Sequence, residues 1–188
     1  MADDRADDRA LPSLGTLVSL PATEHPELLA APVAAALAAW PRADRVAVTE
    51  IDPGLADTAA LTEAFDLPLT ASANCVLVSG RRDGEERVAA CVVRADTRAD
   101  VNNRVKRLLD VRKASFLPMD RAVEESAMEH GGITPVGLPA GWRLLVDARV
   151  ATIDVAVIGS GVRRSKLLLP GRLLAELPAA ELVEDLAG

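Results

Sequence analysis

The sequence predicts a single domain of the α/β class, a mixed α+β chain in which helices alternate with strands and hairpins. The clearest observation is a pair of valine-rich runs, NCVLVSG and RVAACVVR, joined by a short segment that contains Asp83-Gly84, a pair typical of hairpin turns. A second observation is the helical spacing of apolar residues on both sides of this hairpin. A chain of 188 residues also has the length to bury one sizeable core.

Three elements are predicted before the hairpin. The run 26–40 has apolar residues three and four positions apart, so we expect a helix that Pro32 either starts or kinks. Residues 45–52 alternate apolar and polar side chains, which is typical of a half-buried strand. Residues 57–65 begin with polar capping residues followed by good helix formers, and they predict a short helix.

In the second half of the chain, helices and strands are again expected to follow one another. Thr97 and Asp100 have capping-box spacing in front of an amphipathic run, which predicts a helix there. Residues 120–132 are predicted to form another helix, closed by glycines. Strands are expected in WRLLVDA, TIDVAVIGSG and KLLL, and the Leu/Ala-rich C-terminal stretch is expected to be helical.

The N-terminal segment differs in composition from the rest of the chain. The N-terminus carries an ADDR-ADDR duplication without large apolar residues, so segment 1–25 is expected to be mobile and 26–188 to form the single domain. No apolar stretch reaches the ~20 residues that span a bilayer, and the acidic N-terminus does not resemble a signal peptide. We therefore expect a cytoplasmic protein that binds no membrane.

Metal and nucleotide cofactors are not expected. Cys75 and Cys91 lie in apolar runs, where small buried thiols are ordinary, and His25 and His130 do not complete a zinc set with them. Neither a G-x-G-x-x-G nor a G-x-x-x-x-G-K-[ST] phosphate loop is present. The net charge of −7 argues against indiscriminate nucleic-acid binding but leaves room for a local basic surface.

Two glycine-containing segments are candidates for the functional site. In HGGITPVG, from His130 to Gly137, the glycines free the backbone to approach a ligand, and successive N–H groups could stabilise an oxyanion. The same residues could equally be a helix C-cap followed by a turn. In IGSGVRRSK, from Ile158 to Lys166, the glycines could form a second backbone cradle, or simply a tight turn. Ser160 lacks the G-x-S-x-G context of a serine hydrolase.

Basic residues gather in two places on this acidic chain. We expect them to contact the phosphates of a localised anionic partner, although the first group could also be one polar helix face. The candidate phosphate-binding residues are Arg104, Lys106, Arg107, Arg163, Arg164 and Lys166.

Together these segments resemble the YbaK / prolyl-tRNA-synthetase-associated family of aminoacyl-tRNA editing domains, over roughly 46–186. The most specific match is GGITP, the G-x-x-x-P loop of the family, and the valine hairpin and IGSGVRRSKLLLP support it. The resemblance implies a mixed β-barrel or curved sheet surrounded by helices. It also implies a pocket for the aminoacylated 3′ end of tRNA, where the ester of a wrong amino acid is hydrolysed without a cofactor.

The resemblance assigns the site residues as well. The G-x-x-x-P loop corresponds to Gly131, Gly132, Ile133, Thr134 and Pro135, and the substrate-binding turn corresponds to Gly159, Ser160 and Gly161. The family usually has a pocket lysine before the strand written CVLV, where this sequence has Asn74. An amide lacks the mobile positive charge of lysine, so we expect weakened hydrolysis.

Two functions from different classes therefore remain open, and the sequence favours the first. One is a deacylase that acts in trans on misacylated tRNA, with aminoacyl-tRNA as its partner and a synthetase as a further candidate. The other is a catalytically weak or inactive module that binds aminoacyl-tRNA or a small aminoacyl-like ligand. DNA is not an expected partner in either case.

Overall fold

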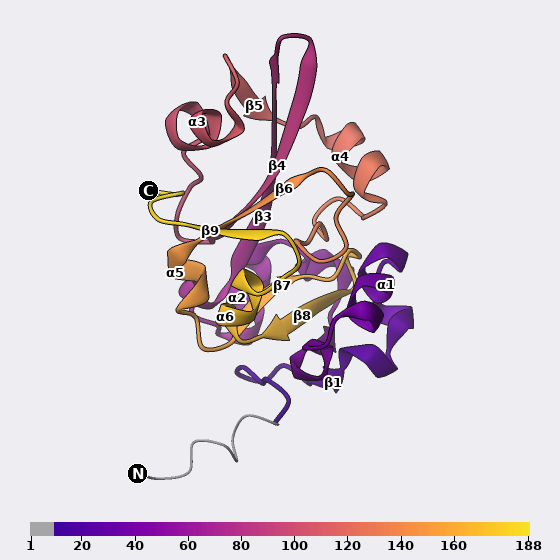
Figure 1. Ribbon diagram of the computed structural model, residues 1–188. Coiled ribbons are helices and arrows are strands. Elements are labelled where there is room, and N and C mark those ends of the chain that lie inside the picture. The colour runs from indigo at the N-terminus through magenta and orange to yellow at the C-terminus, as the bar shows by residue number, and fades with distance from the viewer. Residues whose placement is uncertain (1–9) are drawn as a thin grey trace, which may run out of the picture.

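The computed structural model describes residues 10–188, and its strands form two sheets that together do not close into a barrel (Figure 1). The smaller sheet has the strand order β1-β2-β8-β7, and every neighbouring pair in it is antiparallel. Its strands are β1 (Leu20–Pro21), β2 (Ala47–Glu50), β8 (Ser165–Leu169) and β7 (Ala156–Gly159).

The larger sheet has the order β5-β3-β4-β6-β9. The hairpin of β3 and β4 forms its centre, β5 pairs with β3 antiparallel, and β6 and β9 extend the sheet in parallel from β4. Its strands are β5 (Ala114–Phe116), β3 (Ala73–Arg82), β4 (Glu85–Arg94), β6 (Arg143–Asp147) and β9 (Ala180–Val183).

Short helices surround the sheets and complete the mixed α+β architecture that the sequence predicts (Figure 1). Six are α-helical in the described residues: α1 (Ala31–Ala39), α2 (Thr58–Phe65), α3 (Lys106–Leu109), α4 (Met119–Ser126), α5 (Ala148–Ala151) and α6 (Gly171–Ala175). A π-helical turn, Val101–Val105, leads into α3. None of the helices in residues 10–188 has the length and apolar character needed to cross a membrane.

The hairpin confirms the turn prediction. Asp83 and Gly84 have φ values of 53° and 88°, the left-handed conformation that a two-residue hairpin turn requires at both positions. The strand β4 then alternates between two apolar cores. Val92 belongs to the main core between the two sheets, whereas Cys91 and Val93 belong to a second core under α3. The larger sheet is therefore covered on both faces.

Several predicted element ends shift. Asp100 alone caps the π-helical turn, with its carboxylate accepting from the N–H groups of Asn103 and Arg104, and Thr97 has no part in this cap. The helix expected over 120–132 ends at Ser126, because Ala127 takes a left-handed φ of 54° before the glycines are reached.

The two ends of the fold also differ from the prediction. The C-terminal stretch is helical only in α6 and then forms β9, because parallel pairing with β6 outweighs the helical composition of the segment. Within segment 1–25, Leu17 is buried and β1 pairs with β2, so the fold includes residues before 26. The ADDR-ADDR duplication up to residue 9 lies outside the described residues.

Candidate functional site

A cavity of about 310 Å³ lies where the start of β3 approaches the end of β7, and an isolated parallel bridge between Ser72 and Val157 joins the two sheets at this corner. The N-terminal end of α2 and the loop after α4 complete its walls. The lining combines aliphatic side chains with a few polar ones, which is the usual composition of a site that binds a small organic group. The polar side chains belong to Asp57, Thr58, Ser72, Asn74, His130 and Lys166.

The G-x-x-x-P loop contributes only part of its length to this cavity. Gly131 and Ile133 line it, together with the preceding His130. Gly132 is turned toward the neighbouring turn, because a Cβ built on it would lie 2.8 Å from backbone atoms of Val162. Thr134 is fully buried with no partner for its hydroxyl among the described residues.

The turn after β7 packs directly against this loop. The N–H of Gly161 donates to the carbonyl oxygen of Gly132 at 2.7 Å, and the N–H of Glu129 donates to that of Gly161 at 2.8 Å. Gly159 lines the cavity, but a Cβ on it would lie 2.3 Å from the Gly132 oxygen. The glycines in the loop and in the turn therefore leave room for the two segments to pack closely against each other.

Ser160 does not contribute its hydroxyl to the cavity. The side chain is completely buried, and its Oγ lies 2.7 Å from Oγ of Ser165 and 2.9 Å from the Ser165 carbonyl oxygen. These bonds hold the turn before β8. The geometry agrees with the absence of a serine-hydrolase motif.

Asn74 lies in the lining of the cavity and is exposed to solvent. Its Oδ1 accepts a hydrogen bond from Oγ1 of Thr58, the first residue of α2, at 2.9 Å. Thr58 and Ser72 are lining residues that sequence reasoning did not single out. The Ser72 hydroxyl is buried and has no hydrogen-bond partner among the described residues.

Lys166 is the least expected member of the site. The sequence grouped it with two arginines as a phosphate contact, but the side chain is only 6% exposed and lines the cavity. Its Nζ donates to the carbonyl oxygen of Ala56 at 2.5 Å and approaches that of Gly131 at 3.5 Å. The one sequence signal was its place at the start of an apolar run, inside a strand that is buried throughout.

The surroundings of Lys166 make its ammonium group easier to deprotonate than that of a solvated lysine. Burial lowers the pKa of the ammonium group from its usual value near 10.5 to about 8, and the nearby charge of Arg163 lowers it further. The Asp57 carboxylate acts in the opposite direction but offsets only part of the effect. Lys166 can therefore exchange its proton close to neutral pH.

The two basic clusters occupy different parts of the molecule. Arg163 lies beside the cavity, where its guanidinium donates to the carbonyl oxygens of His130 at 3.1 Å and Pro53 at 3.0 Å. Arg164 is exposed and donates to the Glu27 carbonyl oxygen.

The other cluster consists of Arg104, Lys106 and Arg107, on the π-helical turn and α3. This helical segment packs over the second core, on the face of the larger sheet turned away from the main core. Figure 1 shows α3 well separated from β8. The fold therefore does not bring all six basic residues to the mouth of one cavity.

The cysteines do not have the character of nucleophiles. Cys75 lines the cavity, but burial raises the pKa of its thiol well above the usual range. Burial also raises the pKa of the Cys91 thiol to about 12. Both groups remain protonated at neutral pH and are poor nucleophiles. Residues 10–188 contain no group of three or more His, Cys, Asp or Glu side chains that could hold a metal ion.

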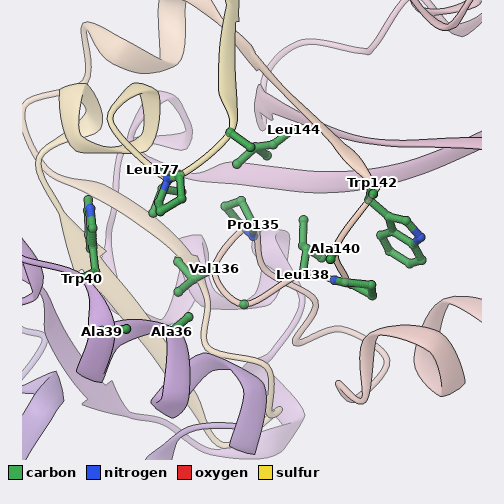
Figure 2. A pocket seen from close by; sticks show the side chains of 15 residues that line it. Ala36, Ala39, Trp40, Pro135, Val136, Leu138, Ala140, Trp142, Leu144 and Leu177 are labelled. Atoms are coloured by element: carbon green, nitrogen blue, oxygen red, sulfur yellow. The ribbon is translucent and has the colours of Figure 1, made fainter.

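A second cavity of about 350 Å³ lies on the other side of the G-x-x-x-P loop (Figure 2). Pro135 and Val136 are among its lining residues, and Trp40 and Trp142 lie on opposite sides of it. Within residues 10–188, no charged side chain lines this cavity. It is slightly larger than the first, but it lacks groups for acid–base or electrostatic catalysis, so the polar cavity is the candidate site.

Comparison with known proteins gives two kinds of match. The profile of the aminoacyl-tRNA editing domain matches residues 52–177. No curated protein matches the chain. Among solved structures, the "hypothetical protein APE2540" is 21% identical with a TM-score of 0.66, and the match covers 75% of this chain and 90% of that one.

A second structure, described as a "putative trans-editing enzyme for prolyl tRNA synthetase", is 17% identical with a TM-score of 0.70, and the match covers 82% of this chain and 94% of that one. At such identities the two structures establish a shared fold. The profile match spans the hairpin, both glycine-containing segments and the polar cavity between them, and the chain therefore belongs to the aminoacyl-tRNA editing domain family.

Proposed function

We propose that this chain hydrolyses the ester of misacylated aminoacyl-tRNA in trans, and that the scissile ester binds in the polar cavity. The observation that carries the proposal is the composition of that cavity in a chain of this family. It places the Gly131 backbone and several polar side chains beside aliphatic walls. Its volume, about 310 Å³, suits a terminal aminoacyl group rather than a macromolecule.

Donors for the carbonyl oxygen are available in the loop. The N–H of Gly132 donates to the Glu129 carbonyl oxygen at 2.9 Å, whereas no hydrogen bond from the N–H of Gly131 or Ile133 is formed within residues 10–188. Fixed N–H donors stabilise the negative charge that develops on a carbonyl oxygen during ester cleavage. We assign that task to Gly131 and Ile133, and not to the full five-residue loop.

The reaction needs no covalent intermediate with the protein. A water oxygen bonds to the carbonyl carbon, the bond from that carbon to the ribose oxygen breaks, and the ribose oxygen takes up a proton. An aminoacyl ester is labile, so positioning of the ester and stabilisation of the oxyanion supply useful acceleration. Ser160 and both cysteines stay outside this scheme because of their hydrogen bonds and raised thiol pKa values.

The trans mode of action is proposed from a structural neighbour. One solved structure of the same fold is described as a trans-editing enzyme for prolyl tRNA synthetase, and it aligns over 94% of its length. A synthetase is therefore a reasonable partner for this chain. Aminoacyl-tRNA is the partner that the family itself implies.

The direct test is release of amino acid from a panel of charged tRNAs, which includes Ala-tRNA and Cys-tRNA, by the purified full chain. We expect acceleration above the spontaneous rate for at least one mischarged species and none for its correctly charged counterpart. A matched control is Leu182→Ala, at an exposed residue on β9 outside the cavity, which should leave the rates unchanged.

Spontaneous rates across the whole panel would contradict hydrolysis. Measurable binding of aminoacyl-tRNA under those conditions would then establish the alternative, a binding module without catalytic activity.

A further inference from the structure

Among the residues that the structure describes, Lys166 is the one lysine or arginine in the lining of the polar cavity. It forms no ion pair with a carboxylate within the described residues. Burying an ammonium group without such a partner is unfavourable, and buried lysines are therefore rare outside functional sites. The packing of β8 alone does not require a charge here, because the residues that follow, Leu167, Leu168 and Leu169, are fully buried and apolar.

The hydrogen bonds of Lys166 leave one donor unused. An ammonium group has three N–H donors. One is directed to the carbonyl oxygen of Ala56 at 2.5 Å, and a second reaches that of Gly131 at 3.5 Å. Both acceptors belong to residues of the cavity wall, so these bonds fix the position of Nζ beside the Gly131 backbone.

From this geometry, and resting on the hydrolytic function proposed above, we propose that Lys166 is a catalytic residue whose ammonium group donates a hydrogen bond to the carbonyl oxygen of the substrate ester. That oxygen becomes an oxyanion when water adds to the carbonyl carbon, and a cation beside it stabilises the transition state more than the ground state. No proton is transferred from Lys166, and the ribose oxygen takes its proton from the attacking water.

The position of Lys166 fits the donors already assigned. Its Nζ lies next to the carbonyl of Gly131, whose N–H is one of the two proposed backbone donors. A single oxygen atom can accept from a backbone N–H and an ammonium group together. The lowered pKa, about 8, means that Lys166 is mainly protonated at pH 7 and loses its charge in mildly alkaline solution.

A purely structural role predicts different behaviour. In that case Lys166 would only tie the segment before α2 to the loop after α4, and its loss would lower stability and weaken substrate binding together. A contact with the developing oxyanion instead predicts a lower kcat with little change in KM. The two roles are therefore separable by kinetics.

The first experiment measures the steady-state hydrolysis of the mischarged tRNA that the wild-type chain cleaves fastest. We expect Lys166→Met to lower kcat about 100-fold while KM changes less than threefold, the size seen when one oxyanion donor is removed. The acceleration by the wild-type chain over the spontaneous rate should fall as the pH rises through about 8, and the small residual acceleration by Lys166→Met should not follow that titration.

A chemical rescue separates charge from packing. Lys166→Cys, alkylated with 2-bromoethylamine, regains a primary amine at nearly the same distance from the backbone, and we expect most of the lost kcat to return. Wild-type chain treated in the same way controls for reaction at Cys75 and Cys91. Unchanged kcat in Lys166→Met, or loss that the restored amine does not reverse, overturns the proposal.

A second measurement needs no substitution at Lys166. The chain has only three lysines, Lys106, Lys113 and Lys166, so ¹³Cε-lysine labelling gives three resonances. An amide analogue of the 3′ end, 3′-aminoacylamino-3′-deoxyadenosine, should shift the Lys166 resonance and its titration midpoint and leave the other two in place.

The two proposals fail in different ways. A Lys166 resonance that is unaffected by bound analogue overturns the contact even if hydrolysis is observed. Spontaneous rates with every tRNA overturn the hydrolytic function, and the catalytic role of Lys166 with it, whether or not the analogue shifts this resonance.

Discussion

The N–H of Gly161 donates to the carbonyl oxygen of Gly132 at 2.7 Å, and this bond joins the two glycine-containing segments of the chain back to back. A Cβ on Gly159 would lie 2.3 Å from the same oxygen, so the contact has no room for a side chain. The loop that lines the polar cavity is thus held from behind by the turn between β7 and β8. Its shape depends on the close packing that glycine allows between the two segments.

The first prediction concerns Gly132. In Gly132→Val, the added Cβ would lie 2.8 Å from the backbone of Val162. Because backbone atoms cannot move aside cheaply, we expect the substitution to lower the free energy of unfolding by about 1–3 kcal/mol and to displace the loop. Urea unfolding followed by circular dichroism measures the loss.

The matched control for this change is Gly188→Val, since a Cβ at Gly188 meets no atom within 4 Å. It should leave the unfolding midpoint unchanged. If Gly132→Val were as stable as this control and only hydrolysis were lost, the added side chain would have to point into the cavity, and the packing described here would be incorrect.

Local chemistry explains which elements the sequence predicts well. The Asp83-Gly84 turn and the alternation along β3 and β4 act between neighbours in the chain, so the hairpin follows from the residues themselves. The strand β9 does not, because its pairing with β6 joins residues far apart and overrides a helical composition. The end of α4 also differs from the prediction, because Ala127 takes a left-handed conformation that residues other than glycine rarely adopt.

In the candidate site, too, the sequence identifies some features and the fold determines others. The resemblance assigned the GGITP loop and the turn after β7 to the site, and in the structure the hydrogen bond between Gly161 and Gly132 joins them. The apolar run after Lys166 is only a weak local sign that this side chain points inward while Arg164, two residues earlier, is exposed. That difference arises from the pairing of β8 between β2 and β7, which leaves Lys166 inside the molecule.

The second prediction concerns Asn74, which is exposed at the cavity and bonded to Thr58. Asn74→Lys should raise hydrolysis about tenfold or change the preferred amino acid, because it adds a mobile charge beside the proposed ester site. The unfolding midpoint should stay within error, since the side chain is solvated. The control is Asn74→Met, because methionine is similar in length to lysine but uncharged. An equal change in hydrolysis with Asn74→Met would exclude charge as the cause.

The third prediction concerns Ser160. Ser160→Ala removes a buried hydroxyl that bonds to Ser165, so we expect a loss of about 1–3 kcal/mol in the free energy of unfolding. The kcat per folded molecule should change less than threefold, because the hydroxyl does not face the cavity. A loss of kcat by orders of magnitude with intact stability would instead identify Ser160 as a nucleophile.

The fourth prediction separates the two basic clusters by the salt dependence of tRNA binding. Replacing Arg163 and Arg164 together with Ala should weaken binding and reduce the slope of log affinity against log salt by about one to two. The control pair, Arg104 and Arg107, lies over the second core away from the cavity, and its replacement should leave the slope unchanged. If the Arg104 and Arg107 replacement reduced the slope and the Arg163 and Arg164 replacement did not, the acceptor stem of the tRNA would lie along α3.

The fifth prediction follows from the lowered pKa of Lys166. An unfolded lysine has a pKa near 10.5, so between pH 8 and 10.5 the unfolded chain binds a proton at this site that the folded chain has released. Stability rises with pH wherever the unfolded state binds more protons. The contribution of Lys166 to the free energy of unfolding is therefore unfavourable below pH 8 and is relieved above it.

Comparison with Lys166→Met isolates this contribution, because the buried cysteines and the other ionisable groups are common to both chains. We expect the wild-type chain to gain up to about 3 kcal/mol relative to Lys166→Met between pH 7 and pH 10.5, from the shift of its pKa to about 8. Urea unfolding of both chains at a series of pH values measures the difference. A constant difference over this range would mean that the Lys166 ammonium group keeps the pKa of a solvated lysine, and that water reaches the cavity more freely than its burial indicates.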